Sequence, residues 1–262
     1  MGSNPTTSTL LVMESFDWDR IAENYNSEVV SPFQKGVVNP LFSKLDSVKA
    51  AKRKTVADIG CGRGEMLDRL ADRFGTVYAI DFSPRMIKFA KRAARRPNIR
   101  FFLRDMRCLS EFRKRFDVAI AVNSILSPKI RDVMKSLKSI HGTLKDGGVF
   151  YGIFPSMGSI LYQAFLILED RIRKTGDERR ALVATKRLLE RKKYNFIKGT
   201  FEDEGMSQKF YYGFELKIRL RKAGFKNVTL SKVLYPWNEG ISDFIKFPGM
   251  PRMWDWFVSA RK

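Results

Sequence analysis

The sequence contains few of the residues that build metal sites, disulfide frameworks or membrane spans. Its 262 residues include two cysteines and one histidine, which excludes a disulfide-stapled scaffold and leaves no Cys/His cluster for a metal ion. No apolar run reaches the roughly 18 to 20 residues that a transmembrane helix needs. The first nine residues are polar and lack the apolar centre of a secretory signal. We therefore expect an intracellular, cytoplasmic protein without a metal.

Acidic residues are scarce relative to basic ones. The chain carries 49 Lys and Arg against 28 Asp and Glu, a net charge of +21. Such an excess attracts polyanions, including nucleic acid and anionic membranes. The charge is spread over many predicted helices, however, so an ordinary solvated surface also explains it. Hydrophobic residues make up 44% of the chain, which is enough for the core of one large α/β domain with additions.

The most informative stretch runs from Thr55 to Leu67, T-V-A-D-I-G-C-G-R-G-E-M-L. Its first five residues are typical of a buried strand, and Leu67, Leu70, Ala71 and Phe74 follow at helical spacing. Three glycines at alternate positions lie between the two patterns. Glycine lets the backbone turn tightly and lets a ligand approach it closely. The stretch therefore predicts the start of a nucleotide-binding βαβ unit.

The spacing of the glycines and acids narrows the class of ligand. A dinucleotide site with G-x-G-x-x-G would have its third glycine at position 65, but that residue is Glu65 and the third glycine is Gly64. Asp58 lies two residues before the first glycine, and a second predicted strand, Thr76 to Ile80, is followed by Asp81. An acid about 20 residues after the glycine turn is placed to hydrogen-bond a ribose.

The segments D-I-G-C-G-R-G and V-Y-A-I-D-F-S together resemble those of class I S-adenosylmethionine-dependent methyltransferases. The resemblance spans residues 16–262. It implies S-adenosyl-L-methionine as cofactor and S-adenosyl-L-homocysteine as product. It also implies an α/β fold, a Rossmann-like seven-stranded and mostly parallel sheet with helices on both faces and a helical lid insertion.

On this basis one domain is divided into five parts. A flexible tail covers residues 1–15, a helical cover 16–50, the cofactor-binding core 51–155, the lid 156–207 and the C-terminal completion of the sheet 208–262. Beyond the first two strands, the pattern predicts strands at 98–104, 117–122, 144–154, 228–234 and 254–260, the last of them antiparallel by resemblance. Helices are predicted at 37–48, 84–96, 160–172 and 181–189, and a further helix ends in A-G-F at 223–225.

The resemblance also assigns roles around the cofactor. The glycine turn passes under its methionine part, Asp81 holds the ribose hydroxyls, Phe82 and Met86 flank adenine, and Asp105 accepts a hydrogen bond from the adenine amino group. The full set of expected cofactor-binding residues is Tyr25, Asp58, Gly60, Cys61, Gly62, Gly64, Asp81, Phe82, Met86, Asp105, Met106, Asn123 and Ser124.

The acceptor side is expected where the fourth strand ends, at Asn123, because parallel sheets bind ligands beyond the carboxyl ends of their strands. The motif N-P-P-Y, typical of methylation at exocyclic base nitrogens, is absent here, as is a cysteine nucleophile. Aromatic residues gather in the segments expected around this edge. The expected substrate residues are Phe154, Tyr162, Tyr211 and Trp237, and the candidate proton-transfer residues are Tyr25, Tyr151, Tyr211 and Tyr212.

Three functions remain in competition. Aromatic walls favour an enzyme that methylates a small, partly apolar molecule. The charge of +21 favours an RNA methyltransferase, whose basic helices would form one face beside the acceptor site. A binding module without activity is the third, because a fold does not fix a function. The motifs name neither the acceptor atom nor an oligomeric state.

Overall fold

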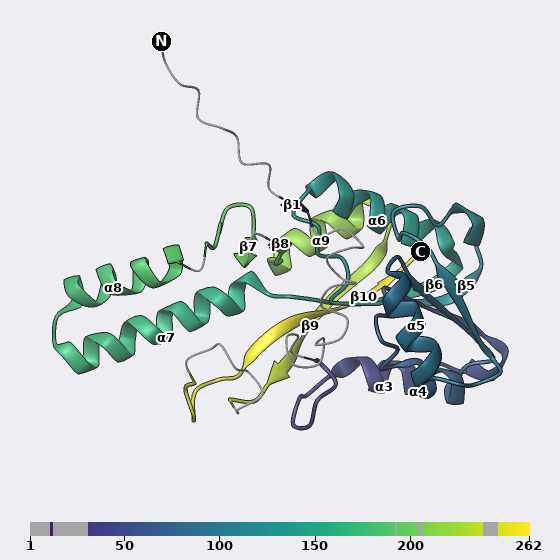
Figure 1. Ribbon diagram of the computed structural model, residues 1–262, viewed down its shortest axis with the longest axis horizontal. Coiled ribbons are helices and arrows are strands. Elements are labelled where there is room, and N and C mark those ends of the chain that lie inside the picture. The colour runs from purple at the N-terminus through teal and green to yellow at the C-terminus, as the bar shows by residue number, and fades with distance from the viewer. Residues whose placement is uncertain (1–10, 13–30, 192, 204–205, 238–245) are drawn as a thin grey trace, which may run out of the picture.

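The computed structural model describes residues 11–12, 31–191, 193–203, 206–237 and 246–262 (Figure 1). Its centre is a seven-stranded sheet in the order β4-β3-β2-β5-β6-β10-β9. The strands are β2 (Thr55–Ile59), β3 (Thr76–Asp81), β4 (Ile99–Leu103), β5 (Phe116–Val122), β6 (Leu144–Phe154), β9 (Lys226–Tyr235) and β10 (Met253–Arg261). Every strand predicted for the sheet is confirmed, with ends shifted by one or two residues.

The direction of the strands places the site. β4, β3, β2, β5 and β6 are parallel neighbours, so their carboxyl ends share one edge of the sheet. β10 is antiparallel to both β6 and β9, and Trp256 is paired with Phe154. The beginning of β10 and the end of β9 therefore lie at the same edge as the ends of the parallel strands. The predicted Rossmann-like arrangement with an antiparallel seventh strand is confirmed.

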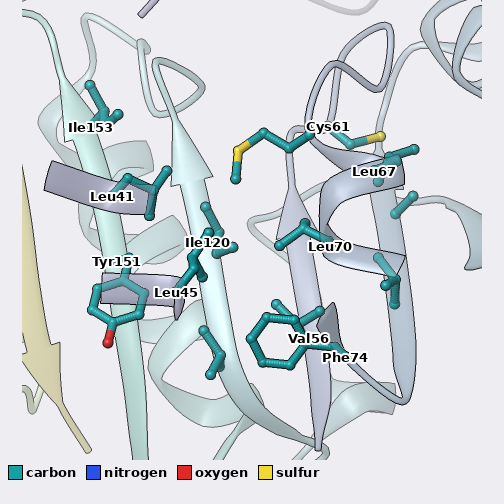
Figure 2. Packing of buried hydrophobic residues seen from close by; sticks show 14 of the residues in the cluster. Leu41, Leu45, Val56, Cys61, Leu67, Leu70, Phe74, Ile120, Tyr151 and Ile153 are labelled. Carbon is teal, nitrogen blue, oxygen red and sulfur yellow. The ribbon is translucent and has the colours of Figure 1, made fainter. Parts of the chain in front are cut away.

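Helices cover both faces of the sheet. One face carries α3 (Pro40–Asp46), α4 (Leu67–Arg73) and α5 (Pro84–Ala93), and the other carries α6 (Ile130–Thr143) and α9 (Gly213–Lys222). Figure 2 shows how Leu41 and Leu45 of α3 and Leu70 of α4 lie against Ile120 and other strand residues. Short 3-10 turns are formed by Ala51–Arg53 and Ser110–Phe112.

Two helices are shorter than predicted, and the residues at their ends explain the difference. The helix predicted over 37–48 is shorter, because Pro40 opens α3 and Asn39 caps it by accepting a hydrogen bond from the Leu41 N–H at 2.9 Å. The helix predicted to reach residue 96 ends at Ala93, and the backbone of Ala94 is extended. A proline at position 97 disfavours helical backbone just before it.

The insertion after β6 contains two helices, as predicted, and they form a hairpin, but none of the described residues of this insertion lines the cavity described below. α7 (Met157–Thr175) is capped by Ser156 and ends at Gly176, which adopts a left-handed φ of 66°. α8 (Glu178–Arg191) then returns along α7. Figure 1 shows the pair projecting from one end of the sheet. None of the described helices is long and apolar enough to cross a membrane.

A second, three-stranded sheet was not predicted. Its order is β1 (Leu11–Val12), β8 (Met206–Lys209) and β7 (Thr200–Asp203). The two residues of β1 fall within the tail that was expected to be flexible, but here they pair in parallel with β8. Backbone pairing between segments almost 200 positions apart leaves no periodic trace in either segment, which is why the sequence pattern did not reveal it.

Candidate active site

The glycine turn after β2 has a backbone that only glycine adopts readily. The φ angles of Gly60, Gly62 and Gly64 are 76°, 52° and 88°, all in the left-handed region. A Cβ atom on Gly60 would lie 2.4 Å from the Cβ of Ser124, so the turn also packs directly against the end of β5. The predicted tight turn is confirmed, and it presents bare backbone at the edge of the sheet.

Asp81 is held beside this turn. Its side chain is 6% exposed. One carboxylate oxygen accepts the N–H of Gly62 and the other accepts the N–H of Ser83, each at 2.9 Å. The hydroxyl of Ser83 in turn caps α5 by accepting the Met86 N–H at 3.0 Å. Backbone donors therefore fix the position of the carboxylate, so that it is already in place when a ligand binds.

Asp58 lies deeper, within β2, and is 4% exposed. Burial, followed by the charges of Asp81 and Glu65, raises its pKa from 3.8 to about 7. The same surroundings raise the pKa of the Cys61 thiol well above its usual value, first through burial and then through Asp81 and Asp58. Cys61 is therefore a neutral thiol, and the turn has a negative potential that favours a bound cation.

A cavity opens at this edge of the sheet, where parallel strands bind ligands beyond their carboxyl ends. Nine of the residues expected to bind the cofactor line it together: Gly60, Gly62, Asp81, Phe82, Met86, Asp105, Met106, Asn123 and Ser124. Asp58, Cys61 and Gly64 do not line the cavity but belong to the strand and turn behind it. Tyr25 lies outside the described residues.

Residues that the sequence reasoning missed complete the cavity wall. They are Arg104, Arg107, Val122, Ile125, Leu126, Ser127, Asp132 and Ser136. Most of them follow directly after β4 or β5, so extending each strand-end prediction by a few residues would have found them. Their apolar members lie on the β5 side of the cavity, where the acceptor was expected.

Asp105 is engaged by a neighbour. The guanidinium of Arg107 donates to its carboxylate at 2.8 and 2.6 Å, and the Arg107 backbone N–H donates at 2.8 Å. Arg107 also lies 3.5 Å from Asp132. Burial alone would raise the pKa of Asp105, but the hydrogen bonds and charge of Arg107 outweigh it and hold that pKa below its ordinary value. Asp105 is therefore an ionised acceptor in the cavity wall.

The tyrosines proposed for the acceptor side occupy different environments. Tyr211 is fully buried against Phe154, and its hydroxyl donates to the carbonyl of Ile125 at 2.6 Å. Tyr212 donates to the carbonyl of Phe196 at 2.8 Å. Tyr151 stacks on Phe257. None of these residues lines the described cavity.

Two further aromatics expected near the substrate meet elsewhere. The hydroxyl of Tyr162 donates to the carbonyl of Pro251 at 2.9 Å, and the indole N–H of Trp237 lies 3.0 and 3.2 Å from the carbonyls of Met250 and Pro251. Tyr162 thus joins the hairpin helix α7, and Trp237 the chain just after β9 (Lys226–Tyr235), to the segment before β10. They do not line the described cavity either.

The site has features that suit S-adenosylmethionine. No group of His, Cys, Asp or Glu in the described part of the chain is arranged to hold a metal. The glycine turn offers bare backbone, Asp81 offers a fixed carboxylate, and the buried acids favour a positively charged ligand. These features match a ribose-containing cation.

Comparison with known proteins agrees with this geometry. Residues 56–148 match the family model described as a methyltransferase domain. The chain is 28% identical over 147 residues to a malonyl-[acyl-carrier protein] O-methyltransferase from Acetivibrio thermocellus, covering 53% of this chain and 48% of that protein. It is 28% identical over 118 residues to a ubiquinone biosynthesis O-methyltransferase from Coxiella burnetii, covering 44% and 50%. The chain thus spans about half the length of these relatives.

Solved structures extend the likeness over most of the chain. A S-adenosylmethionine-dependent methyltransferase from Methanosarcina mazei superposes with a TM-score of 0.56 and 18% identity, covering 86% of this chain and 98% of that one. At this identity the likeness concerns the fold. It includes the region beyond residue 148, which the family model does not match.

Proposed function

We propose that this protein, in which residues 56–148 form a class I S-adenosylmethionine-dependent methyltransferase domain, transfers the methyl group of S-adenosylmethionine to a small molecule. One observation carries the proposal. The fixed carboxylate of Asp81 and the bare glycine turn face the same cavity as the end of β5, the side on which an acceptor would bind. Free thiols at Cys61 and Cys108 fit a reducing compartment such as the cytoplasm.

Different residues of the cavity would bind the methionine part, the ribose and the adenine of the cofactor. The turn from Gly60 to Gly64 would hold the methionine part, with Asp58 behind it. Asp81 would accept hydrogen bonds from the ribose hydroxyls, since backbone donors hold both of its oxygens in place at the cavity wall. Phe82, Met86, Met106 and Asp105 would surround the adenine.

When bound, S-adenosylmethionine supplies a methyl group on a positively charged sulfur. The protein then has to hold an acceptor in line with that group and keep water out. Positioning of this kind supplies about 7–11 kcal/mol when the geometry is good. Val122, Ile125 and Leu126 line the β5 side of the cavity and would pack against an apolar acceptor.

Two features support a small acceptor. Apolar side chains of Val122, Ile125 and Leu126 form one side of the cavity, as is usual in sites for small molecules. Both relatives are named O-methyltransferases, which favours a hydroxyl or carboxyl oxygen as the atom that is methylated.

RNA is the second candidate acceptor, and the charge of +21 favours it. The exposed side of α8 carries Arg179, Arg180, Arg187 and Arg191, and no carboxylate in the described chain forms an ion pair with any of these four. RNA bound through such residues would lose affinity steeply as salt increases.

Two measurements test the proposal. Calorimetry with S-adenosylmethionine and S-adenosylhomocysteine is expected to give micromolar affinity, and absence of heat at high protein concentration would refute the assignment. Transfer of a labelled methyl group is then followed in parallel into small-molecule extracts and into cellular RNA, between 50 and 300 mM salt as rough limits. Label in RNA, with submicromolar and salt-sensitive binding, would replace the small acceptor by RNA. Cofactor binding without transfer to either would favour a binding module.

A further inference from the structure

The turn between α8 and β7 presents an isoleucine to solvent. Asn195 and Thr200 exchange two backbone hydrogen bonds at 2.8 and 3.1 Å, which close a turn over residues 196–199. The Asn195 side chain also accepts the Lys198 N–H at 2.9 Å. Ile197 lies in this turn and is 98% exposed. A large apolar side chain is therefore held outward by a closed turn.

The start of α9 continues this apolar surface. The Tyr212 hydroxyl donates to the carbonyl of Phe196, the neighbour of Ile197, at 2.8 Å. The Tyr212 ring stacks on that of Phe214, with 5.1 Å between the ring centroids. Phe214 is 67% exposed and Ile218 is 52% exposed, and residues four apart lie on the same face of a helix. We refer to Ile197, Tyr212, Phe214 and Ile218 as the apolar patch.

A buried lysine joins the two parts of the apolar patch. Lys209 is fully buried, and its amine donates to the carbonyl of Lys198 in the turn at 2.8 Å and to the carboxylate of Glu215 in the first turn of α9 at 2.9 Å. Figure 1 shows β7, β8 and α9 next to one another. Because one amine bonds to both the turn and the helix, it fixes the position of Ile197 relative to Phe214.

Basic side chains flank the apolar patch. The one acid of α9, Glu215, pairs with the buried Lys209. Of the acids described in β7, Glu202 pairs with Lys193, and Asp203 lies at the end of the strand away from the turn. The exposed charge next to the patch is therefore positive. The exposed basic residues beside it in the turn and on α9 are Lys198, Lys217, Arg221 and Lys222.

The shape and chemistry of the apolar patch fit a lipid surface. A helical partner segment binds in a groove, but side chains as exposed as Ile197 and Phe214 protrude, and no patch residue lines either of the described cavities. Proteins that bind at a membrane surface bury apolar side chains at the boundary of head groups and acyl chains, while Lys and Arg are attracted to anionic lipids. The patch and its flanking residues have both features.

We propose that the apolar patch and its flanking basic residues dock on an anionic phospholipid membrane. Ile197 and Phe214 would enter the boundary between head groups and acyl chains, and the flanking lysines and arginine would lie at the lipid phosphates. The attraction to polyanions that the net charge of +21 implies thereby acquires a defined surface. The proposal goes beyond the proposed function and does not require it.

Docking would also place the cavity. The Lys209 N–H donates to the carbonyl of Leu126, a residue of the cavity wall, at 2.8 Å. Tyr212 of the apolar patch follows Lys209 by three positions, a stretch that spans at most about 11 Å. A docked membrane would therefore lie near the β5 side of the cavity.

Binding to vesicles tests the proposal. Wild-type protein is sedimented with vesicles of phosphatidylcholine alone, or of phosphatidylcholine with about 30% phosphatidylglycerol. We expect binding to the anionic vesicles to be at least about tenfold tighter, and to weaken as NaCl increases from about 0.1 to about 0.5 M, because salt screens exposed charges. Absence of binding to either kind of vesicle would overturn the proposal.

One pair of variants tests the apolar side chains. Ile197→Ser combined with Phe214→Ser should weaken binding to anionic vesicles at least about tenfold, since two large apolar groups no longer enter the lipid. Val38→Ser combined with Leu103→Ser is the matched control, because these side chains are 53% and 46% exposed outside the patch. The control should bind as the wild type does. Equal binding by the two double variants would overturn the proposal.

A second pair tests the charge. Lys217→Gln combined with Lys222→Gln should weaken binding to anionic vesicles several-fold and reduce its dependence on salt. Lys88→Gln combined with Arg92→Gln removes the same charge from α5, which covers the other face of the sheet, and should weaken binding less than about twofold. Equal effects of the two pairs would show that net charge alone drives binding, and would overturn the assignment to the patch.

Two further measurements keep this proposal apart from the alternatives. Sedimentation velocity without lipid should show the same oligomeric state for wild type and for Ile197→Ser combined with Phe214→Ser. A wild-type dimer that this double variant converts to monomers would assign the patch to a second copy of the chain and overturn the proposal. Calorimetry should give unchanged affinity for S-adenosylhomocysteine in every variant, and the vesicle assay itself uses no cofactor, so failure of the proposed function would leave its result intact.

Discussion

Replacing Asp58 by asparagine should stabilise this protein, and only above acidic pH. Asp58 is 4% exposed within β2, and no described group donates a hydrogen bond to its carboxylate. Its ionised form is opposed by burial and by the charges of Asp81 and Glu65. Asparagine has nearly the same shape and never ionises, so the substitution removes the charge with little change in packing.

The size and sign of the effect follow from the pKa. A rise from 3.8 in the unfolded chain to about 7 in the folded protein corresponds to roughly 4 kcal/mol. Because the folded state binds the proton more tightly, the free energy of unfolding falls as the pH rises from about 4 to about 7. The full cost is present above pH 7, where Asp58 ionises in the folded protein. Below pH 4 it is absent, since the group is protonated in both states.

Urea unfolding of wild type and Asp58→Asn at several pH values between about 4 and 8 measures this difference. We expect the stability of the variant relative to wild type to increase by about 2–4 kcal/mol over that range. Comparing the two proteins at each pH removes the contribution of the other titrating groups. Both proteins are measured without cofactor, because a bound cation would favour ionised Asp58.

Asp146→Asn is the control. Asp146 is exposed, and the hydrogen bond and charge of Lys114 lower its pKa, so any trend in this variant should be small and opposite in sign. A stability difference between Asp58→Asn and wild type that does not change with pH would refute the reasoning. If the stability of Asp58→Asn minus that of wild type were smaller at pH 8 than at pH 4, the predicted sign of the effect would be wrong.

The remaining predictions concern the cofactor site and one buried cation. Affinity for S-adenosylmethionine should increase between pH 6 and 8 as Asp58 ionises, and calorimetry in two buffers should detect the released proton; affinity that is independent of pH would contradict this. Asp81→Asn should weaken S-adenosylhomocysteine binding at least tenfold, through loss of about 1.5–3 kcal/mol of charge-assisted hydrogen bonding, while circular dichroism shows an intact fold. Lys209 is fully buried and donates to two backbone carbonyls and to Glu215 at 2.7–2.9 Å, so Lys209→Met should cost about 3–5 kcal/mol in urea unfolding. Lys193→Met, which breaks an exposed ion pair with Glu202, should cost less than about 1 kcal/mol.

The sequence predicted the glycine turn and the acid beside it because the signals for both are local. The three glycines with left-handed φ angles follow directly after β2, and Asp81 is the last residue of the next strand, β3, so each signal belongs to one short segment. Parallel strands then collect their carboxyl ends at one edge, so Asp81, Asp105 and Asn123 came together in one cavity without any knowledge of side-chain contacts.

Composition could not separate cavity walls from core on the acceptor side. Phe154 and Tyr211 were singled out because aromatic residues are dense in these segments, but the structure packs them against each other with almost no exposed surface. Likewise, nothing in the sequence distinguishes Lys209 from the other basic residues, of which there are 49 in all. Only the fold buries its amine among backbone carbonyls and Glu215. Burial depends on what lies opposite a residue, which its own neighbours in sequence do not specify.

Long-range pairing decided the rest. Asn123 and Asp255 are 132 positions apart and share a hydrogen bond because β10 runs back along β6. Leu11–Val12 pairs with β8 through its backbone, and any residues but proline can make such hydrogen bonds. The periodicity of a segment records which of its faces is buried, but not which distant segment lies against it. The contact of Asn123 with Asp255 and the small sheet are therefore decided only by the tertiary structure.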